Sequence, residues 1–149
     1  MKFIAVLVMI IVSISAAVIV PRGGIPLTHQ VAQAKLEAAG IYMTSTGNCT
    51  DWWIVKCTSY EGILSGTVDN VIALHNASGC SILITGATEV GHPNVYYGHF
   101  NGYAVNMQKN QCLYDYVNKY FNKISNNSWK SVAGNLYILG TYAWDITYY

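Results

Sequence analysis

The chain has little charge of either sign, because only 10% of its 149 residues are Asp, Glu, Lys or Arg. Arginine occurs once, at Arg22. Without residues 1–17 the chain has seven basic and seven acidic residues, so its net charge is close to zero. A neutral domain lacks the positive surface to which nucleic acids and anionic membranes bind. The composition therefore argues against nucleic acid and membrane surfaces as partners.

No long apolar run follows the first 20 residues of the chain. Residues 3–20 are nearly all apolar, follow a basic start and end in small residues, which is the pattern of a secretory signal peptide. A single membrane anchor is the alternative, because the run is near the minimum length of a span. Arg22 is the only basic residue close behind it, which is a weak stop for an anchor. We expect a signal peptide over residues 1–17 and a secreted, extracellular protein.

The chain contains no Cys-x-x-Cys pair, so its cysteines lack the spacing of a zinc knuckle. An even number of cysteines in a secreted chain indicates disulfide bonds, here two. The four residues are Cys49, Cys57, Cys80 and Cys112. Three pairings are possible, and we favour Cys49–Cys57 together with Cys80–Cys112.

Three Asn-x-Ser/Thr sequons add to the case for secretion if the host is a eukaryote. Their acceptors are Asn48, Asn76 and Asn126. We therefore expect a glycoprotein in such a host.

Hydrophobic periodicity and capping residues predict three helices and five strands. Thr28 and Thr67 are the expected helix caps. The helices are expected at residues 28–39, 67–76 and 112–121, and the strands at 41–46, 81–85, 102–107, 135–139 and 144–149. Helices and strands do not alternate strictly, which favours an α+β fold with a small, mainly antiparallel sheet and about three helices. We expect a flexible mature start over residues 18–27 and a single domain over 28–149.

Most titratable residues are scattered, but Glu89, His92 and His99 lie close together in the loop between two expected strands. Loops between core strands often hold functional residues. Carboxylate and imidazole groups at this spacing could supply three zinc ligands. The alternative is that these three side chains bind no metal and only form hydrogen bonds within the loop.

Residues 85–89 (Thr-Gly-Ala-Thr-Glu) and 99–106 (His-Phe-Asn-Gly-Tyr-Ala-Val-Asn) resemble the core of the D-alanyl-D-alanine carboxypeptidase-like zinc peptidases. This superfamily includes bacterial dipeptidases, phage endolysins and the hedgehog signalling domain. In particular, the chain resembles a secreted branch of fungi and actinomycetes across residues 28–149. The matching segments are residues 38–41, 57–59, 78–80, 85–92 and 144–147. The resemblance implies a hedgehog-like or peptidase-like fold.

The family motif His-x-x-Gly-x-Ala-Val-Asp implies zinc ligands at positions 99 and 106, and here they are His99 and Asn106. The family's second motif, Glu-x-x-His-Trp, supplies a catalytic base and a third ligand, which fall on Gly140 and Ala143. The arginine that binds substrate in many relatives falls on Thr88.

Catalytic zinc requires three protein ligands and a positioned base. By the resemblance, one strong zinc ligand remains and the zinc site is degenerate. Asp145 lies on the same face of its expected strand as Ala143, because side chains alternate along a strand, and is a weak substitute ligand.

These departures favour an inactive homologue that acts as an extracellular binding or effector protein, with no cofactor. Its ligand would be a peptide or a cell-wall fragment, and the protein would be a monomer. Four tyrosines could line a groove for it: Tyr97, Tyr103, Tyr142 and Tyr148. The alternative is a zinc peptidase acting on peptidoglycan-type peptides with a site rebuilt from Glu89, His92 and His99. A secreted structural protein is a third interpretation.

Overall fold

A computed structural model describes residues 23–149 of the chain. The expected signal peptide at 1–17 therefore lies outside the described residues. Three helices and seven strands form the described part. The helices are α1 (His29–Ala38), α2 (Ser65–Ser78) and α3 (Gln111–Tyr120). The strands are β1 (Tyr42–Met43), β2 (Leu83–Gly86), β3 (Ala104–Gln108), β4 (Asn122–Ser125), β5 (Ser128–Lys130), β6 (Leu136–Leu139) and β7 (Ala143–Thr147).

All seven strands belong to one sheet with the order β1-β2-β3-β7-β6-β5-β4. Only β1 and β2 pair in parallel, and the other neighbours are antiparallel. This arrangement confirms the expected α+β class and the mainly antiparallel sheet. In residues 23–149, no helix combines the length and the apolar character that crossing a membrane requires.

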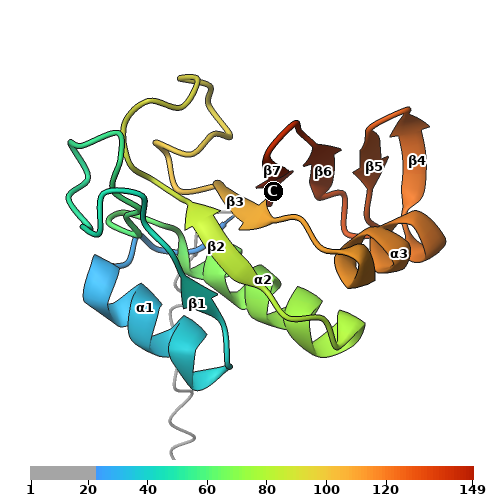
Figure 1. Ribbon diagram of the computed structural model, residues 1–149, viewed down its shortest axis with the longest axis horizontal. Coiled ribbons are helices and arrows are strands. Elements are labelled where there is room, and N and C mark those ends of the chain that lie inside the picture. The colour runs from blue at the N-terminus through green and yellow to red at the C-terminus, as the bar shows by residue number, and fades with distance from the viewer. Residues whose placement is uncertain (1–22) are drawn as a thin grey trace, which may run out of the picture.

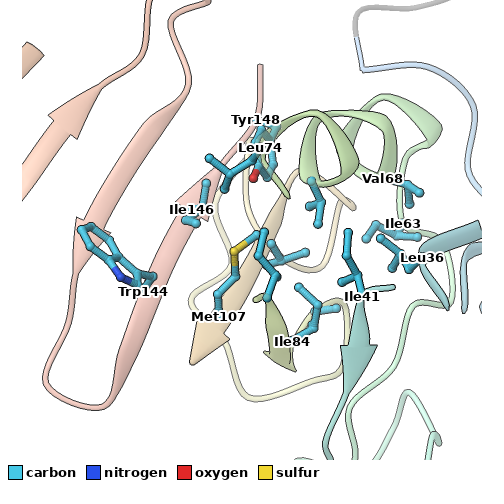
Figure 2. Close-up of a cluster of buried hydrophobic side chains, with 14 of the residues drawn as sticks. Leu36, Ile41, Ile63, Val68, Leu74, Ile84, Met107, Trp144, Ile146 and Tyr148 are labelled. Atoms are coloured by element: carbon cyan, nitrogen blue, oxygen red, sulfur yellow. The ribbon is translucent and has the colours of Figure 1, made fainter. Parts of the chain in front are cut away.

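One face of the sheet packs against the helices and forms the core. Alternate residues of β3 and β7, such as Met107, Trp144 and Ile146, are buried there with Ile84 of β2. Figure 2 shows Met107, Ile84 and Ile146 gathered with side chains of the helices such as Leu74, whereas Trp144 lies farther away along β7. The opposite face, here called the outer face, is half-buried, and two long loops rise beside it, at the top of Figure 1.

Both disulfides have the favoured pairing. Cys49 is bonded to Cys57 within the loop that follows β1, and Cys80 is bonded to Cys112 at the start of α3. Their sequence separations are 8 and 32 residues. The second bond joins the segment before β2 to α3 and encloses β2, β3 and the loop between them.

Local sequence signals account for two of the helix starts. Thr28 caps α1 through its hydroxyl, as expected, and Asn110 caps α3 by accepting from the Leu113 amide at 2.8 Å. The expected cap at Thr67 is wrong, because α2 begins at Ser65. The Thr67 hydroxyl instead donates to the carbonyl of Gly102 at 2.7 Å, which ties α2 to the chain entering β3.

Two strand predictions need correction. The expected strand at 41–46 pairs only over Tyr42–Met43, after which the chain turns into the first disulfide loop. The hairpin of β4 and β5 is absent from the sequence prediction. All four residues of β4 are exposed, so no alternation of apolar and polar residues marks this strand.

The described part of the expected flexible start, residues 23–27, is held by backbone hydrogen bonds. Leu27 exchanges bonds with the 62–63 turn at 2.8 and 2.9 Å, and the amides of Ser65 and Gly66 donate to carbonyls in 23–25. The expectation of flexibility is therefore wrong for residues 23–27, because these bonds attach them to the first turn of α2.

Candidate functional site

Asn106, to which the resemblance assigns a zinc-ligand position, and Asp145 lie side by side on the outer face of the sheet. Asn106 of β3 pairs with Asp145 of β7 on one side and with Gly86 of β2 on the other. Asn106 and Asp145 alternate with core residues, so their side chains lie on the face away from the helices. The Asp145 side chain is 47% exposed. The sheet register thus presents one amide and one carboxylate side by side.

The loop between β2 and β3 places His99 over this pair. Gly102 closes the loop with φ of 79°, and a Cβ at this position would lie 2.5 Å from the carbonyl oxygen of Gly62. Only glycine satisfies both the left-handed backbone and the close approach. The turn fixes the preceding residues, and His99 is buried as a result.

Both ring nitrogens of His99 face oxygen atoms. Nδ1 lies 2.6 Å from the carbonyl oxygen of Ala87, and Nε2 lies 3.3 Å from Oδ1 of Asp145. A carbonyl oxygen can only accept, so Nδ1 carries a proton and donates it. This bond fixes the orientation of the ring and directs Nε2 toward Asp145.

Glu89 is a buried carboxylate that accepts several hydrogen bonds. The Ser59 amide donates to it at 2.8 Å, and the Ala87 amide reaches both of its oxygens at 3.0 and 3.1 Å. His92 Nε2 lies 2.9 Å from Glu89 Oε1. Burial on its own raises the pKa of this carboxyl group, but the hydrogen bonds from His92, Ser59 and Ala87 outweigh it. The net result is a lowered pKa, so Glu89 is held as a carboxylate.

The two imidazole rings connect the two carboxylates. His92 and His99 stack with their ring centroids 3.8 Å apart and their planes 10° from parallel. Glu89, His92, His99 and Asp145 therefore form one continuous group, which we call the Glu89–Asp145 cluster. All four residues are candidates from the sequence, and the structure brings them together.

The residues at this cluster do not fit a catalytic zinc centre of the family's type. Glu89 is committed to two backbone amides and His92, and Asn106 offers an amide where the family has a carboxylate. Within residues 23–149 no three His, Cys, Asp or Glu side chains are placed to hold one metal ion. Ala143 has no ligand group to add.

The aligned positions of the catalytic base and the substrate arginine have other roles. Gly140 lies in the turn between β6 and β7, where its amide donates to the Ala143 carbonyl at 2.9 Å and its own carbonyl accepts from Lys109 at 3.0 Å. Thr88 is buried, and its hydroxyl is directed toward the carbonyls of Ser59 and Glu61 at 2.8 and 2.7 Å. Neither residue offers a group that could take a proton from water or bind a substrate carboxylate.

Aromatic side chains that the sequence analysis did not select border the cluster. Trp52 donates from its indole nitrogen to the carbonyl of Thr88, and its ring lies 5.1 Å from those of Trp53 and Phe100. Trp53 is 70% exposed, and Ile54, Val55 and Phe100 are also exposed. We call Trp52, Trp53, Ile54, Val55 and Phe100 the aromatic border.

The four tyrosines proposed to line a groove do not gather in one place. Tyr97 and Tyr103 pack edge to face at 5.1 Å, and Tyr97 also contacts Tyr149. Tyr142 is 92% exposed in the β6–β7 turn. The expectation for Tyr148 is wrong, because it is buried against Tyr137, in step with Trp144 and Ile146.

The three sequon asparagines are exposed at separate places. Asn48 lies in the first disulfide loop with φ of 50°, Asn76 lies in α2, and Asn126 lies in the turn between β4 and β5. All three side chains are open to solvent, as an N-linked glycan requires.

Comparison with protein-family models, curated proteins and solved structures finds no match for this chain.

Proposed function

We propose that the protein is a secreted, catalytically inactive homologue of the zinc D-Ala-D-Ala peptidases that acts as an extracellular binding or effector protein. The proposal combines the family resemblance with the state of the Glu89–Asp145 cluster. The buried carboxylate of that cluster, Glu89, accepts hydrogen bonds from two backbone amides and from His92. A group so committed stabilises the loop and is poorly placed to activate water.

The aromatic border is the observation that favours binding. Exposed tryptophan and aliphatic side chains that adjoin polar groups are typical of surfaces that recognise other molecules. Within the Glu89–Asp145 cluster, Asp145 and His92 are partly exposed polar groups, with side chains 47% and 23% exposed. A peptide or cell-wall fragment offers the apolar and hydrogen-bonding groups that such a surface would contact. The two disulfides fit an oxidising extracellular environment.

One observation favours the alternative, a zinc peptidase with a rearranged site. His99 donates Nδ1–H to a backbone carbonyl, which is how ligating histidines are commonly oriented, and its Nε2 lies beside Asp145. These two groups could hold a cation only if a third ligand came from a rearrangement of His92 or Glu89.

The zinc content of the mature domain, residues 18–149, separates the two functions. The domain is dialysed against metal-free buffer, given one equivalent of zinc and measured again after gel filtration. We expect no stoichiometric retention. About one equivalent held at micromolar affinity, lost in His99→Ala and kept in the control His75→Ala, would establish the alternative. His75 is a suitable control because it lies in α2, outside the cluster.

Titration with peptidoglycan-derived peptides then tests the binding function. We expect Trp53→Ala to weaken binding by roughly tenfold, because it removes a large exposed contact. Tyr142→Ala removes an even more exposed aromatic ring, which lies outside the aromatic border, and should leave the affinity unchanged. Equal losses in both variants, or no binding by the unmodified protein, would contradict the proposed surface.

A further inference from the structure

The lysines of this nearly neutral chain are concentrated in one segment. Residues 109–132 contain four lysines and one acidic residue, whereas the rest of the described chain contains two lysines and six acidic residues. This segment comprises α3, the β4–β5 hairpin and the start of the loop after it. The charge is therefore unevenly distributed, and three of the four lysines lie in α3 and the β4–β5 hairpin.

Two of these lysines line one cavity of about 510 Å³ between the end of α3 and the end of β5. Lys119 comes from the last turn of α3, and Lys130 is the last residue of β5. Tyr120 and Asn122 line the same cavity. The Tyr120 ring is 55% exposed, so its surface is available for stacking.

The ammonium groups of this segment have no acidic partner. Among the ion pairs of residues 23–149, the only one that includes a lysine is Lys35–Asp69, far from the segment in sequence. Lys119 lies 4.9 Å from the Tyr120 ring centroid, and Lys123 lies 5.4 Å from that of Trp129. Lysines held against aromatic rings keep their charge and can still bind an anion.

Lys130 also lines a second cavity of about 370 Å³. The exposed rings of Tyr97 and Tyr149 line this cavity and contact each other edge to face at 5.0 Å. Lys130 pairs with Leu136 of β6, which in turn pairs with Thr147 of β7, so the shared lysine lies two strands away from β7. The two cavities thus place aromatic rings on both sides of one unpaired ammonium group.

We propose that these two cavities form one cleft that binds an acidic oligosaccharide, a glycan chain whose sugars carry carboxylate or sulfate groups. Lys130 and Lys119 would pair with the acidic groups of the glycan. Tyr120 on one side and Tyr97 with Tyr149 on the other would stack on sugar rings. Asn122 would hydrogen-bond to hydroxyl groups. The cleft uses none of the Glu89–Asp145 cluster, so this inference does not rest on the proposed function.

Two other roles for these lysines predict different results. Lysines protect exposed strand edges from pairing with other chains, and β4 is an edge strand. That role predicts aggregation of lysine variants but no ligand. An acidic peptide pairing with β4 would use backbone groups and would not need sugar rings. Exposed aromatic rings beside the ammonium groups in both cavities favour the glycan.

Calorimetric titration of the mature protein with tetragalacturonate and with a chondroitin sulfate tetrasaccharide tests the cleft. The methyl ester of tetragalacturonate is the matched neutral ligand, and tetraglutamate is the peptide comparison. We expect binding of at least one acidic glycan, with affinity falling as sodium chloride is raised. The ester and tetraglutamate should bind at least tenfold more weakly.

Lys130→Gln should weaken binding by roughly tenfold, because it removes the ammonium group that both cavities share. Lys56→Gln removes the same charge from an exposed loop position and should change the affinity by less than twofold. Asp145→Asn should also leave it unchanged, which separates this cleft from the proposed binding surface. Matching thermal unfolding curves would show that the variants are folded.

Three results would overturn the proposal. They are equal affinity for the acid and its ester, equal affinity for tetraglutamate, and no binding of either acidic glycan at millimolar concentration. Equal weakening by Lys130→Gln and Lys56→Gln would also overturn it, because the net charge rather than the cleft would then attract the glycan.

Discussion

The two long loops, one after β1 and one between β2 and β3 with Glu89, His92 and His99, are held by different forces from the β4–β7 meander. The loops depend on buried polar groups such as Glu89, on a tight turn at Gly102 and on the first disulfide. The meander depends on aromatic packing, with the Trp129 and Trp144 ring centroids 5.4 Å apart. Polar groups fix positions, whereas apolar burial supplies most of the stability. The loops should therefore be the part that opens first.

The largest expected effect comes from the meander. Trp129→Ala removes a fully buried ring and should reduce the free energy of unfolding by about 4 kcal/mol, measured by urea denaturation. Trp53→Ala, in the loop after β1, removes a ring that is 70% exposed. This variant should change the free energy of unfolding by less than about 0.5 kcal/mol. Similar losses in both variants would mean that aromatic packing stabilises the loops as much as the meander.

The stability lost on removing a disulfide should be larger for the bond that closes the longer stretch of chain. Serine replacement of both Cys80 and Cys112, which are separated by 32 residues, should cost about 3.7 kcal/mol from lost loop-closure entropy. The same change at Cys49 and Cys57, which are separated by 8 residues, should cost about 2.6 kcal/mol. Denaturation of both double variants without reductant measures the order. A larger loss for the shorter loop would show that it stabilises the loops beyond its entropic effect.

A smaller loss of stability than from either disulfide is expected at Glu89. Glu89→Gln replaces a carboxylate that accepts from two amides and His92, and should cost about 2 kcal/mol at neutral pH. Glu37→Gln, on the exposed side of α1, is the matched control and should be nearly neutral.

The contribution of the Glu89 carboxylate to the free energy of unfolding should decrease as the pH falls. The folded pKa of Glu89 lies below the ordinary value of 4.5, so the unfolded chain takes up a proton first as the pH falls. The carboxylate therefore stabilises the fold above that value, and this contribution is lost as the pH falls through the lower, folded pKa. The difference between wild type and Glu89→Gln should shrink from pH 6 to pH 3. A difference that grows on acidification would contradict the lowered pKa.

Secondary structure could be predicted from the sequence where buried residues follow a regular apolar pattern and a capping residue marks the start of the element. Helix α1, with its cap at Thr28, and strand β7, which holds Trp144 and Ile146, follow from capping and periodicity. The disulfide pairing and the meeting of Glu89, His92 and His99 were also anticipated. The β4–β5 hairpin was not, because Trp129 is its one buried residue and all of β4 is exposed.

The other features that the sequence did not predict depend on contacts between segments far apart in the chain. Asp145 became the partner of His99 through the register of β7 against β3, which strand alternation alone does not specify. The aromatic border depends on Trp52 reaching Thr88 across 36 residues of chain. Tyr148 was expected at a groove but follows the buried side of its strand.

The Cys80–Cys112 bond has a consequence for how the protein responds to proteolysis. Cleavage by a protease at the exposed stretch around Tyr96, within the ring that this bond closes, would produce two fragments that stay covalently joined. Glu89 would remain on one fragment and Asn106 on the other, and β2 would still lie beside β3. A nicked molecule would run as one species until it is reduced, so this loop can be cut without the two halves of the candidate site separating.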